Sequence, residues 1–191
     1  MTRRRKNQPG HLEATQYATN EDVCRIFTEN LDRLYLLSFL LTGNHERAEQ
    51  CFVGGLADSV EGNQIFRKWA HSWAKRTIIQ NAIRALQPRA GRAGGPPAGL
   101  SHNGQALTLG DSELYRVLAL EDFERFVFVM SVLERYSDQE CALLLGCSIQ
   151  DIRETRVRAL EHIAASTNTD LSHKDSAVHK FEHVPPAGKC S

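Results

Sequence analysis

The residues with the clearest potential for chemistry are cations and aromatic side chains that alternate between positions 66 and 76. They are Phe66, Arg67, Lys68, Trp69, Trp73, Lys75 and Arg76. No Asp or Glu occurs between Glu61 and Asp111. Because cations neutralise phosphates and flat rings stack on unpaired bases, this pattern predicts binding to single-stranded or melted DNA. The alternative is structural, since Trp69 and Trp73 lie four residues apart on one helical face and could both pack in the core.

A second candidate site lies in residues 136–163, where two helices are predicted on either side of Gly146. Two hydroxyl residues precede a carboxylate by three positions, the spacing that caps a helix start: Ser137 with Glu140, and Ser148 with Asp151. The expected packing residues are Cys141, Ala142, Leu144 and Leu145 on the first helix, and Ile149, Ile152, Ala159, Leu160 and Ile163 on the second. This pattern predicts a helix-turn-helix, whose second helix can enter a DNA major groove. A generic helical hairpin within an all-α core is the alternative.

Four polar side chains on the second helix of this motif are candidates for contacting DNA: Gln150, Arg153, Arg156 and Arg158. On the same helix, Asp151 and Glu154 repel phosphates, although a Glu can accept a hydrogen bond from cytosine. Residues 111–163 carry eleven Asp or Glu and six Arg but no Lys. The field of this half therefore does not attract DNA broadly.

The rest of the composition argues against an enzyme. The chain has 191 residues and a formal net charge of zero, enough for one domain or two small ones. Its five cysteines are odd in number and form no CxxC pair: Cys24, Cys51, Cys141, Cys147 and Cys190. We find no nucleophile–base pair, phosphate loop or metal-binding pattern, and expect neither catalysis, nor a metal, nor a cofactor.

The sequence also predicts a cytoplasmic protein without a membrane segment. The cations of residues 3–6 are followed by the polar stretch NQPGHLEATQ, whereas a secretory signal continues with an apolar core. The apolar run Leu34–Leu41 is too short to span a bilayer.

Helical periodicity positions both candidate sites. Apolar residues at a spacing near 3.6 predict helices over residues 22–41, 45–60 and 65–86, and again from residue 112 onwards. The density of Gly and Pro in residues 88–110 predicts a flexible linker. We therefore expect an all-α fold of two small helical domains joined by a flexible Gly/Pro-rich linker, the second domain being the helix-turn-helix. The predicted segments are a basic flexible N-terminus (1–17), a first helical domain (18–87), the linker (88–110), a helix-turn-helix domain (111–166) and a disordered tail (167–191).

Several short stretches recur in this order in one known family. In the second half they are Glu124–Val129, then Tyr136–Ser148, then Ile149, Ile152, Arg153 and Arg158. In the first half they are Thr42–Asn44 with Ala48 and Glu49, and Phe66–Trp69. Over about three quarters of its length the chain resembles the bacterial RNA polymerase sigma factors of the extracytoplasmic-function type, which belong to the sigma-70-like proteins.

The resemblance implies a transcription initiation factor with a region 2-like first domain and a region 4-like second domain. It implies core RNA polymerase and promoter DNA as partners, and it allows an anti-sigma factor. Polymerase binding would fall to Glu49, Gln50 and Val53. The melted −10 strand would meet Arg67, Lys68, Trp69, Lys75 and Arg76. The −35 element would meet Gln150, Arg153, Arg156 and Arg158.

Some positions depart from the family pattern. Gln50–Val53, followed by two glycines, stands where the family has Asp-Leu-Val-Gln, and Arg156 occupies a position that is normally apolar. The altered Gln50–Val53 stretch favours two alternatives, and the acidic second half favours the first of them. One is a sigma-fold protein-interaction module that does not initiate transcription. The other is a helix-turn-helix regulator that never contacts polymerase.

Overall fold

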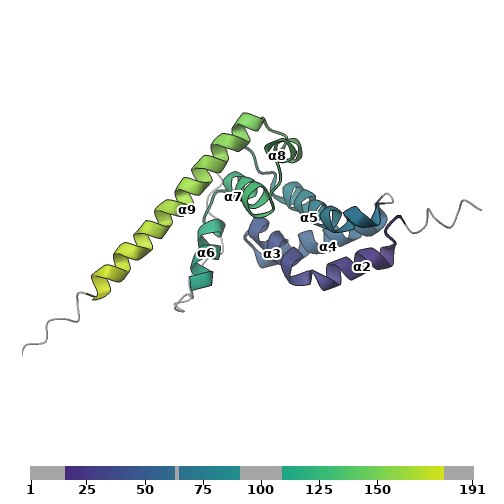
Figure 1. Cartoon of the computed structure of the whole chain (residues 1–191), viewed down its shortest axis with the longest axis horizontal. Coiled ribbons are helices and arrows are strands. Elements are labelled where there is room, and N and C mark those ends of the chain that lie inside the picture. Colours follow the sequence, from purple (N-terminus) through teal and green to yellow (C-terminus); the bar gives the residue numbers. More distant parts are fainter. Residues whose placement is uncertain (1–15, 63–64, 91–108, 179–191) are drawn as a thin grey trace, which may run out of the picture.

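The described part of the chain is built from helices. The computed structural model describes residues 16–62, 65–90 and 109–178, with the backbone alone for 109–112 and 166–178. The elements are α2 (Asn20–Glu29), α3 (Leu31–Thr42), α4 (His45–Glu61), the 3₁₀ turn η1 (Arg67–Trp69), α5 (Ala70–Leu86), α6 (Leu109–Leu118), α7 (Asp122–Phe128), the π-helical turn η2 (Val129–Leu133), α8 (Asp138–Leu145) and α9 (Ile149–Val178) (Figure 1). Within these ranges β pairing is limited to one isolated bridge between Tyr17 and Phe66. The all-α prediction is confirmed.

The single helix expected over residues 22–41 is two helices, and Asn30 separates them. Its backbone N–H donates to the Ile26 carbonyl at 3.1 Å, and its side-chain amide donates to the same carbonyl at 2.9 Å. Asn side chains compete with the backbone for such carbonyls, and here the chain leaves helical geometry at φ −114° and ψ 22°. The expectation failed because apolar spacing continues smoothly through this break.

The core of the first half depends on a close approach of α4 to α5. A Cβ atom on Gly55 would lie 2.7 Å from Cγ1 of Ile78 and 3.1 Å from its backbone nitrogen. The two helices therefore meet at a point where only glycine fits. Beside it, the Ser59 and Thr77 hydroxyls form a buried hydrogen bond of 2.9 Å. Helix α5, which carries the candidate cations, is thus held rigidly against α4.

In the second half, α9 packs against α7 along a narrow stripe. Ile152 and Ala159 are fully buried as predicted, and so is Cys141 on α8. Ile149 and Leu160 were expected in the same core but are 40% and 44% exposed. The buried stripe instead continues through the buried Thr155, so α7 covers a narrower face of α9 than the apolar pattern suggested.

The two halves contact each other through α3 and α7. Their buried apolar side chains form one continuous cluster. At the contact, the fully buried Arg125 donates from Nε to the Leu41 carbonyl at 3.3 Å and from Nη1 to the Leu120 carbonyl at 2.9 Å. Its Nη2 pairs with Asp122 at 2.5 Å. Arg125 thus holds the end of α3 against the second half, a contact that no local pattern predicted.

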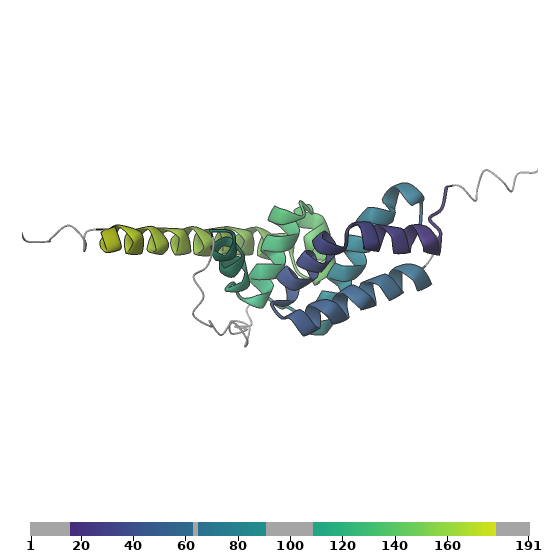
Figure 2. The ribbon, with the colours of Figure 1, turned by 90° about the horizontal axis from the view of Figure 1, so that it is seen from below.

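Two predicted boundaries differ from the structure. Tyr17 was placed in the flexible N-terminus, yet its ring stacks on Phe66 at 4.8 Å between centroids. Helix α9 continues to Val178, into the expected tail, because no Gly or Pro interrupts the sequence before Pro185. In both views α9 extends away from the other helices (Figures 1 and 2). Residues 91–108, most of the predicted linker, and residues 1–15 and 179–191 lie outside the described residues.

Candidate nucleic-acid interface

A cluster of aromatic rings, Tyr17, Phe66 and Trp69, forms where the backbone of residues 16–18 pairs with that of residues 65–67. Arg67 N–H donates to the Gln16 carbonyl at 2.8 Å, and Ala18 N–H donates to the Ile65 carbonyl at 2.7 Å. These bonds fix Phe66 in place. The Trp69 ring then meets the Phe66 ring edge-on at 5.1 Å, and the Lys68 ammonium lies 4.8 Å from the Trp69 centroid. Trp69 is 54% exposed, so its ring is available to a ligand.

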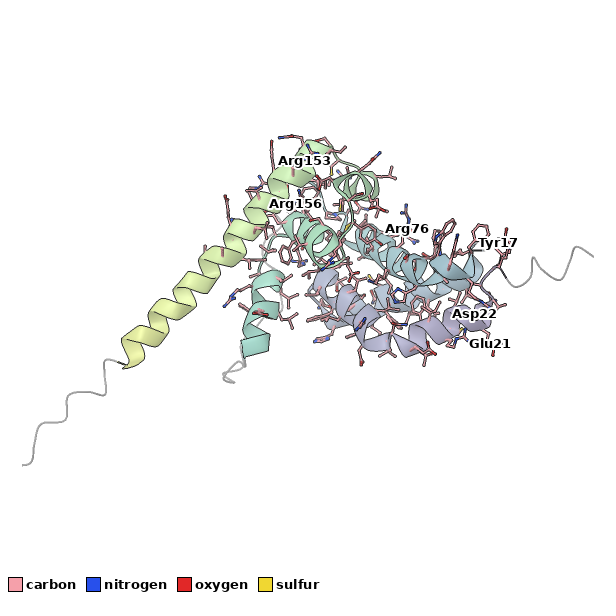
Figure 3. The ribbon with its side chains drawn as sticks, viewed as in Figure 1. Tyr17, Glu21, Asp22, Arg76, Arg153 and Arg156 are labelled. Atoms are coloured by element: carbon pink, nitrogen blue, oxygen red, sulfur yellow. The ribbon has the colours of Figure 1, made fainter. Side chains whose placement is uncertain are left out.

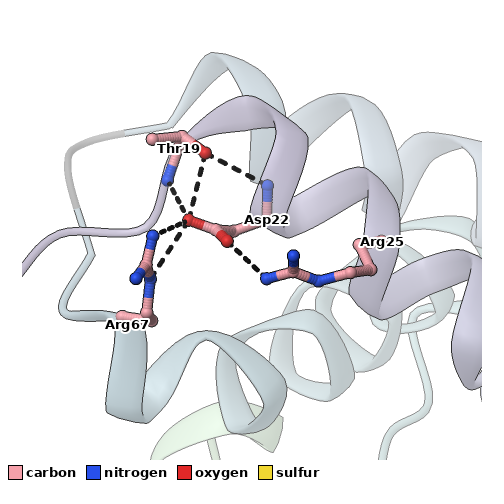
Figure 4. A network of polar contacts seen from close by, with 4 residues as sticks. All are labelled: Thr19, Asp22, Arg25 and Arg67. Carbon is pink, nitrogen blue, oxygen red and sulfur yellow. Dashed lines mark hydrogen bonds and ion pairs between the residues drawn. The ribbon is translucent and has the colours of Figure 1, made fainter. Parts of the chain in front are cut away.

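Arg67 is held by an acid of the first half. Its Nε and Nη2 donate to one Asp22 oxygen at 3.2 and 2.7 Å, and Arg25 pairs with the other oxygen at 2.5 Å (Figure 4). Asp22 also accepts from the Thr19 N–H and hydroxyl. The Thr19 hydrogen bond, followed by that of Arg67, lowers the pKa of Asp22 well below its ordinary value. Arg67 therefore anchors η1 to α2, although half of its side chain remains exposed.

A groove of about 630 Å³ runs between α5 and the segment that joins η2 to α8. Its rings and cations include Phe66, Trp69, Trp73, Arg76, Arg135 and Tyr136. The buried Trp73 Nε1 has no hydrogen-bond partner within the described residues. Arg76 is half-buried, and no described residue forms a hydrogen bond or ion pair with its guanidinium. Trp73 is thus neither a simple core anchor nor freely exposed, and it stands at the wall of this groove.

The second half supplies the opposite wall, which the sequence did not predict. Glu134 pairs with Lys75 at 2.5 Å, so that predicted DNA contact is neutralised within the molecule. Arg135 follows in a left-handed conformation with φ 59°. Burial, reinforced by the charge of Glu134, raises the pKa of Tyr136 to about 12, so its hydroxyl stays protonated at neutral pH. Residues 134–136 lie far from α5 in sequence, and no rule of local spacing predicts that they contact this helix.

The segment predicted as a helix-turn-helix consists of α8, a turn at Gly146 and α9. Ser137 and Glu140 form the predicted capping box, with the Ser137 N–H donating to the carboxylate at 2.8 Å. Ser148 and Asp151 repeat it at 2.9 Å. Gly146 has φ 67°, the left-handed geometry that glycine favours, and its N–H donates to the Ala142 carbonyl. The local signals for these two helix starts and the turn are therefore correct.

The arginines of α9 are paired with acids of their own half. Arg153 and Arg156 lie on the part of α9 nearest α8 (Figure 3). Asp138 of α8 accepts from Arg153 Nε at 2.9 Å and also from Arg156. The hydrogen bond of Arg153, followed by that of Arg156, lowers the pKa of Asp138. Arg158 lies 3.6 Å from the buried Glu124. These pairs leave Arg153 62% exposed but hold Arg156 closer to the protein, with 32% exposure.

The remaining predicted residues lie on exposed faces. Gln150 donates to Glu154 at 2.7 Å, so the amide and the acid meet on the outer face of α9. On α4, the expected polymerase contacts Glu49, Gln50 and Val53 are exposed, Val53 to 57%. Between them Cys51 is buried, and Phe52 packs edge-on against Phe27. This stretch of α4 therefore presents a polar strip with one apolar side chain, Val53, on the surface.

Two further searches cover the described residues alone. Among them no group of three His, Cys, Asp or Glu side chains is arranged to hold a metal ion. None of their helices has both the length and the apolar character needed to cross a membrane.

The sequence matches no protein-family model and no curated protein. Among solved structures, the chain is similar to the sigma factor RpoE of Bartonella quintana, whose structure was determined in complex with the anti-sigma factor NepR. The sequences are 18% identical, and the match covers 78% of this chain and 99% of that one with a TM-score of 0.47. A likeness of this size does not by itself establish a shared fold or function.

Proposed function

We propose that this protein is a sigma-like transcription initiation factor that binds core RNA polymerase and promoter DNA. The observation that carries the proposal is the groove beside α5, a helix without acids, where the rings of Phe66, Trp69 and Trp73 lie together with the cations Arg76 and Arg135. Rings stack on unpaired bases and cations neutralise their phosphates, so this surface suits melted promoter DNA. Trp69 and Arg76 line this groove and Lys68 lies over the Trp69 ring, whereas Arg67 and Lys75 are paired with Asp22 and Glu134.

The second promoter contact falls to α9. A helix that follows a tight turn can lie in the major groove with its first residues against the base edges. Gln150 and Arg153 are exposed in the first two turns of α9 and would read the −35 element. Arg156 pairs with Asp138, the acid that also holds Arg153, so we assign Arg156 to positioning Arg153. We assign Arg158 to a phosphate contact.

Polymerase binding falls to the exposed face of α4, with Val53 as its apolar centre and Glu49 and Gln50 beside it. An interface gains most from apolar surface surrounded by polar groups. This face lies on the helix opposite to the α4–α5 contact at Gly55, so it is free while the core stays closed.

A second candidate function is a protein-interaction module that does not initiate transcription. It is favoured by the ion pairs of the α9 arginines with Asp138 and Glu124, because these acids weaken the attraction of the arginines for DNA phosphates. Exposed apolar side chains on α8 and α9 also favour it, namely Leu143 at 74% and Val157 at 55% exposure. Apolar surface of this kind suits a protein partner better than DNA.

The two candidates differ in what they require of polymerase. Purified full-length protein is mixed with core RNA polymerase and analysed by size-exclusion chromatography, alongside Val53→Glu. The matched control is Leu31→Glu, which changes a similarly exposed apolar residue, 50% accessible, on α3. We expect wild type and Leu31→Glu to co-elute with core and Val53→Glu to elute free. Failure of the wild type to bind core contradicts the initiation-factor proposal, and binding without initiation favours the interaction module.

A further inference from the structure

We propose that the second half completes the single-strand site: Arg135 and Tyr136 bind an unpaired nucleotide together with Trp73 and Arg76 of α5. The inference deepens the proposed function and rests on it. It assigns single-strand binding to the packed arrangement of both halves, and therefore to the free protein as well as to a polymerase complex. Without the turn between η2 and α8, the groove would have one wall.

The first support is the indole N–H of Trp73. A buried donor without a partner is unfavourable, because it has lost its hydrogen bonds to water. Trp73 lines the groove, and its Nε1 has no acceptor among the described residues. A nucleotide offers base carbonyls and phosphate oxygens as acceptors. Because Nε1 is buried, a nucleotide could accept from it only after the groove wall moves, and binding would then pair a donor that has no acceptor among the described residues.

The second support is the backbone of Arg135. Non-glycine residues avoid positive φ, yet Arg135 has φ 59° at the mouth of the groove. Such conformations persist where the surroundings fix them, and they concentrate at binding sites. The guanidinium groups of Arg135 and Arg76 form no hydrogen bond or ion pair with the described residues, although the charge of Arg76 helps to lower the pKa of Glu140. Two cations without a direct partner among the described residues thus line one cavity.

The third support is the chemistry of the whole cavity. One of its two acids is neutralised, since Glu134 pairs with Lys75, whereas Glu140 accepts from the backbone and hydroxyl of Ser137 and keeps its negative charge near Arg76. With Arg76 and Arg135 against Glu140, the cavity keeps a net positive charge, and rings from Phe66, Trp69, Trp73 and Tyr136 line it. An acidic peptide would satisfy the cations alone. Unpaired nucleotides satisfy both the cations and the rings, which is why we assign single-stranded nucleic acid as the occupant.

Intrinsic fluorescence gives a direct test, because the chain has two tryptophans and both line this groove. The full-length protein is titrated with a thymidine octamer, an abasic octamer of the same charge, and an acidic peptide. We expect the thymidine octamer to quench the fluorescence and to bind about tenfold more tightly than the abasic one, because base stacking contributes. Equal affinity for the abasic octamer or the peptide would overturn the assignment of a nucleobase.

Variants of the turn separate a binding role from a structural one. Arg135→Gly suits the left-handed backbone, so we expect unchanged or higher thermal stability together with about tenfold weaker octamer binding from the lost cation. Arg135→Lys should recover most of that affinity. Gln87→Gly is the matched control, because Gln87 also has positive φ, at 46°, but lies outside the groove. Arg47→Gln, an exposed arginine on α4, controls for net charge.

Wild-type binding by Arg135→Gly, or no octamer binding by the wild type, overturns the inference. The proposed function is judged separately by core-polymerase binding. Initiation by a protein whose free form ignores the octamer would overturn the inference alone. Octamer binding without any polymerase complex would contradict the initiation factor alone.

Discussion

The two cationic surfaces of this molecule differ in what their charges touch. Around the α5 groove, Arg76 and Arg135 form no ion pair within the described residues, although the charge of Arg76 acts on Glu140, and Lys68 lies over an exposed ring. On α9, Arg153 and Arg156 share Asp138, and Arg158 faces Glu124. The sequence offered both sets as DNA contacts. The ion pairs of the folded chain distinguish them, and affinity for phosphate should reside mainly in the groove.

The largest expected effect comes from reversing a groove charge. We expect Arg76→Glu to weaken binding of a thymidine octamer by about 2–3 kcal/mol, roughly 50-fold, because an attraction becomes a repulsion. Fluorescence titration of the full-length protein measures this change. Arg47→Glu on α4 makes the same charge change and should leave octamer binding within about twofold, since its effect is screened over distance. Similar losses in both variants would mean that net charge, and not the groove, governs binding.

Removing the acid that holds the α9 arginines should have a smaller effect of opposite sign. We expect Asp138→Asn to strengthen binding to a non-specific 30-base-pair duplex about fivefold. The slope of log affinity against log salt concentration should become steeper by about the amount that one additional phosphate contact adds. The free energy of unfolding should fall by only about 1 kcal/mol, because ion pairs near the surface contribute little to it. Anisotropy at several salt concentrations measures the first effect. Glu161→Gln, an exposed acid on the same helix, is the control. Equal slopes in both variants would refute the account of Asp138.

The same pair makes the second half sensitive to acid. The pKa of Asp138 is lowered in the folded protein, so its stabilising contribution is present above the ordinary Asp value of about 4 and is lost as pH falls through the folded pKa. We expect wild type to lose its excess stability over Asp138→Asn as the pH falls below about 4. Thermal unfolding of both proteins from pH 6 to pH 3 tests this. A stability difference that stays constant with pH would argue against the ion pairs.

The smallest effect on octamer binding is expected from the packing that holds the groove helix. Gly55→Ala should destabilise the protein by about 1–3 kcal/mol, because the added methyl meets the Ile78 backbone. At Gly54 the added methyl instead meets the amide of the Asn81 side chain, which can move, so Gly54→Ala should cost less. Denaturant unfolding compares the two. Since neither residue lines the groove, octamer affinity should stay within about twofold while the protein remains folded.

Local signals in the sequence predicted the helices and caps well. Ser137, Ser148 and Gly146 act within a few residues of themselves, so their roles could be derived from spacing alone. The break at Asn30 was missed because a single side-chain hydrogen bond decided it. The candidate sites were harder. Lys75 with Glu134, and Arg125 with Leu41, join residues far apart in sequence, and such partners become known only when the chain has folded.

The central claim is that this protein starts transcription by combining the groove, α9 and the exposed face of α4. Run-off transcription with core polymerase on a library of genomic fragments from the source organism tests it most directly. We predict defined start sites that require the protein, are lost in Arg76→Glu and persist in Arg47→Glu. Transcripts no different from those of core polymerase alone would contradict the claim.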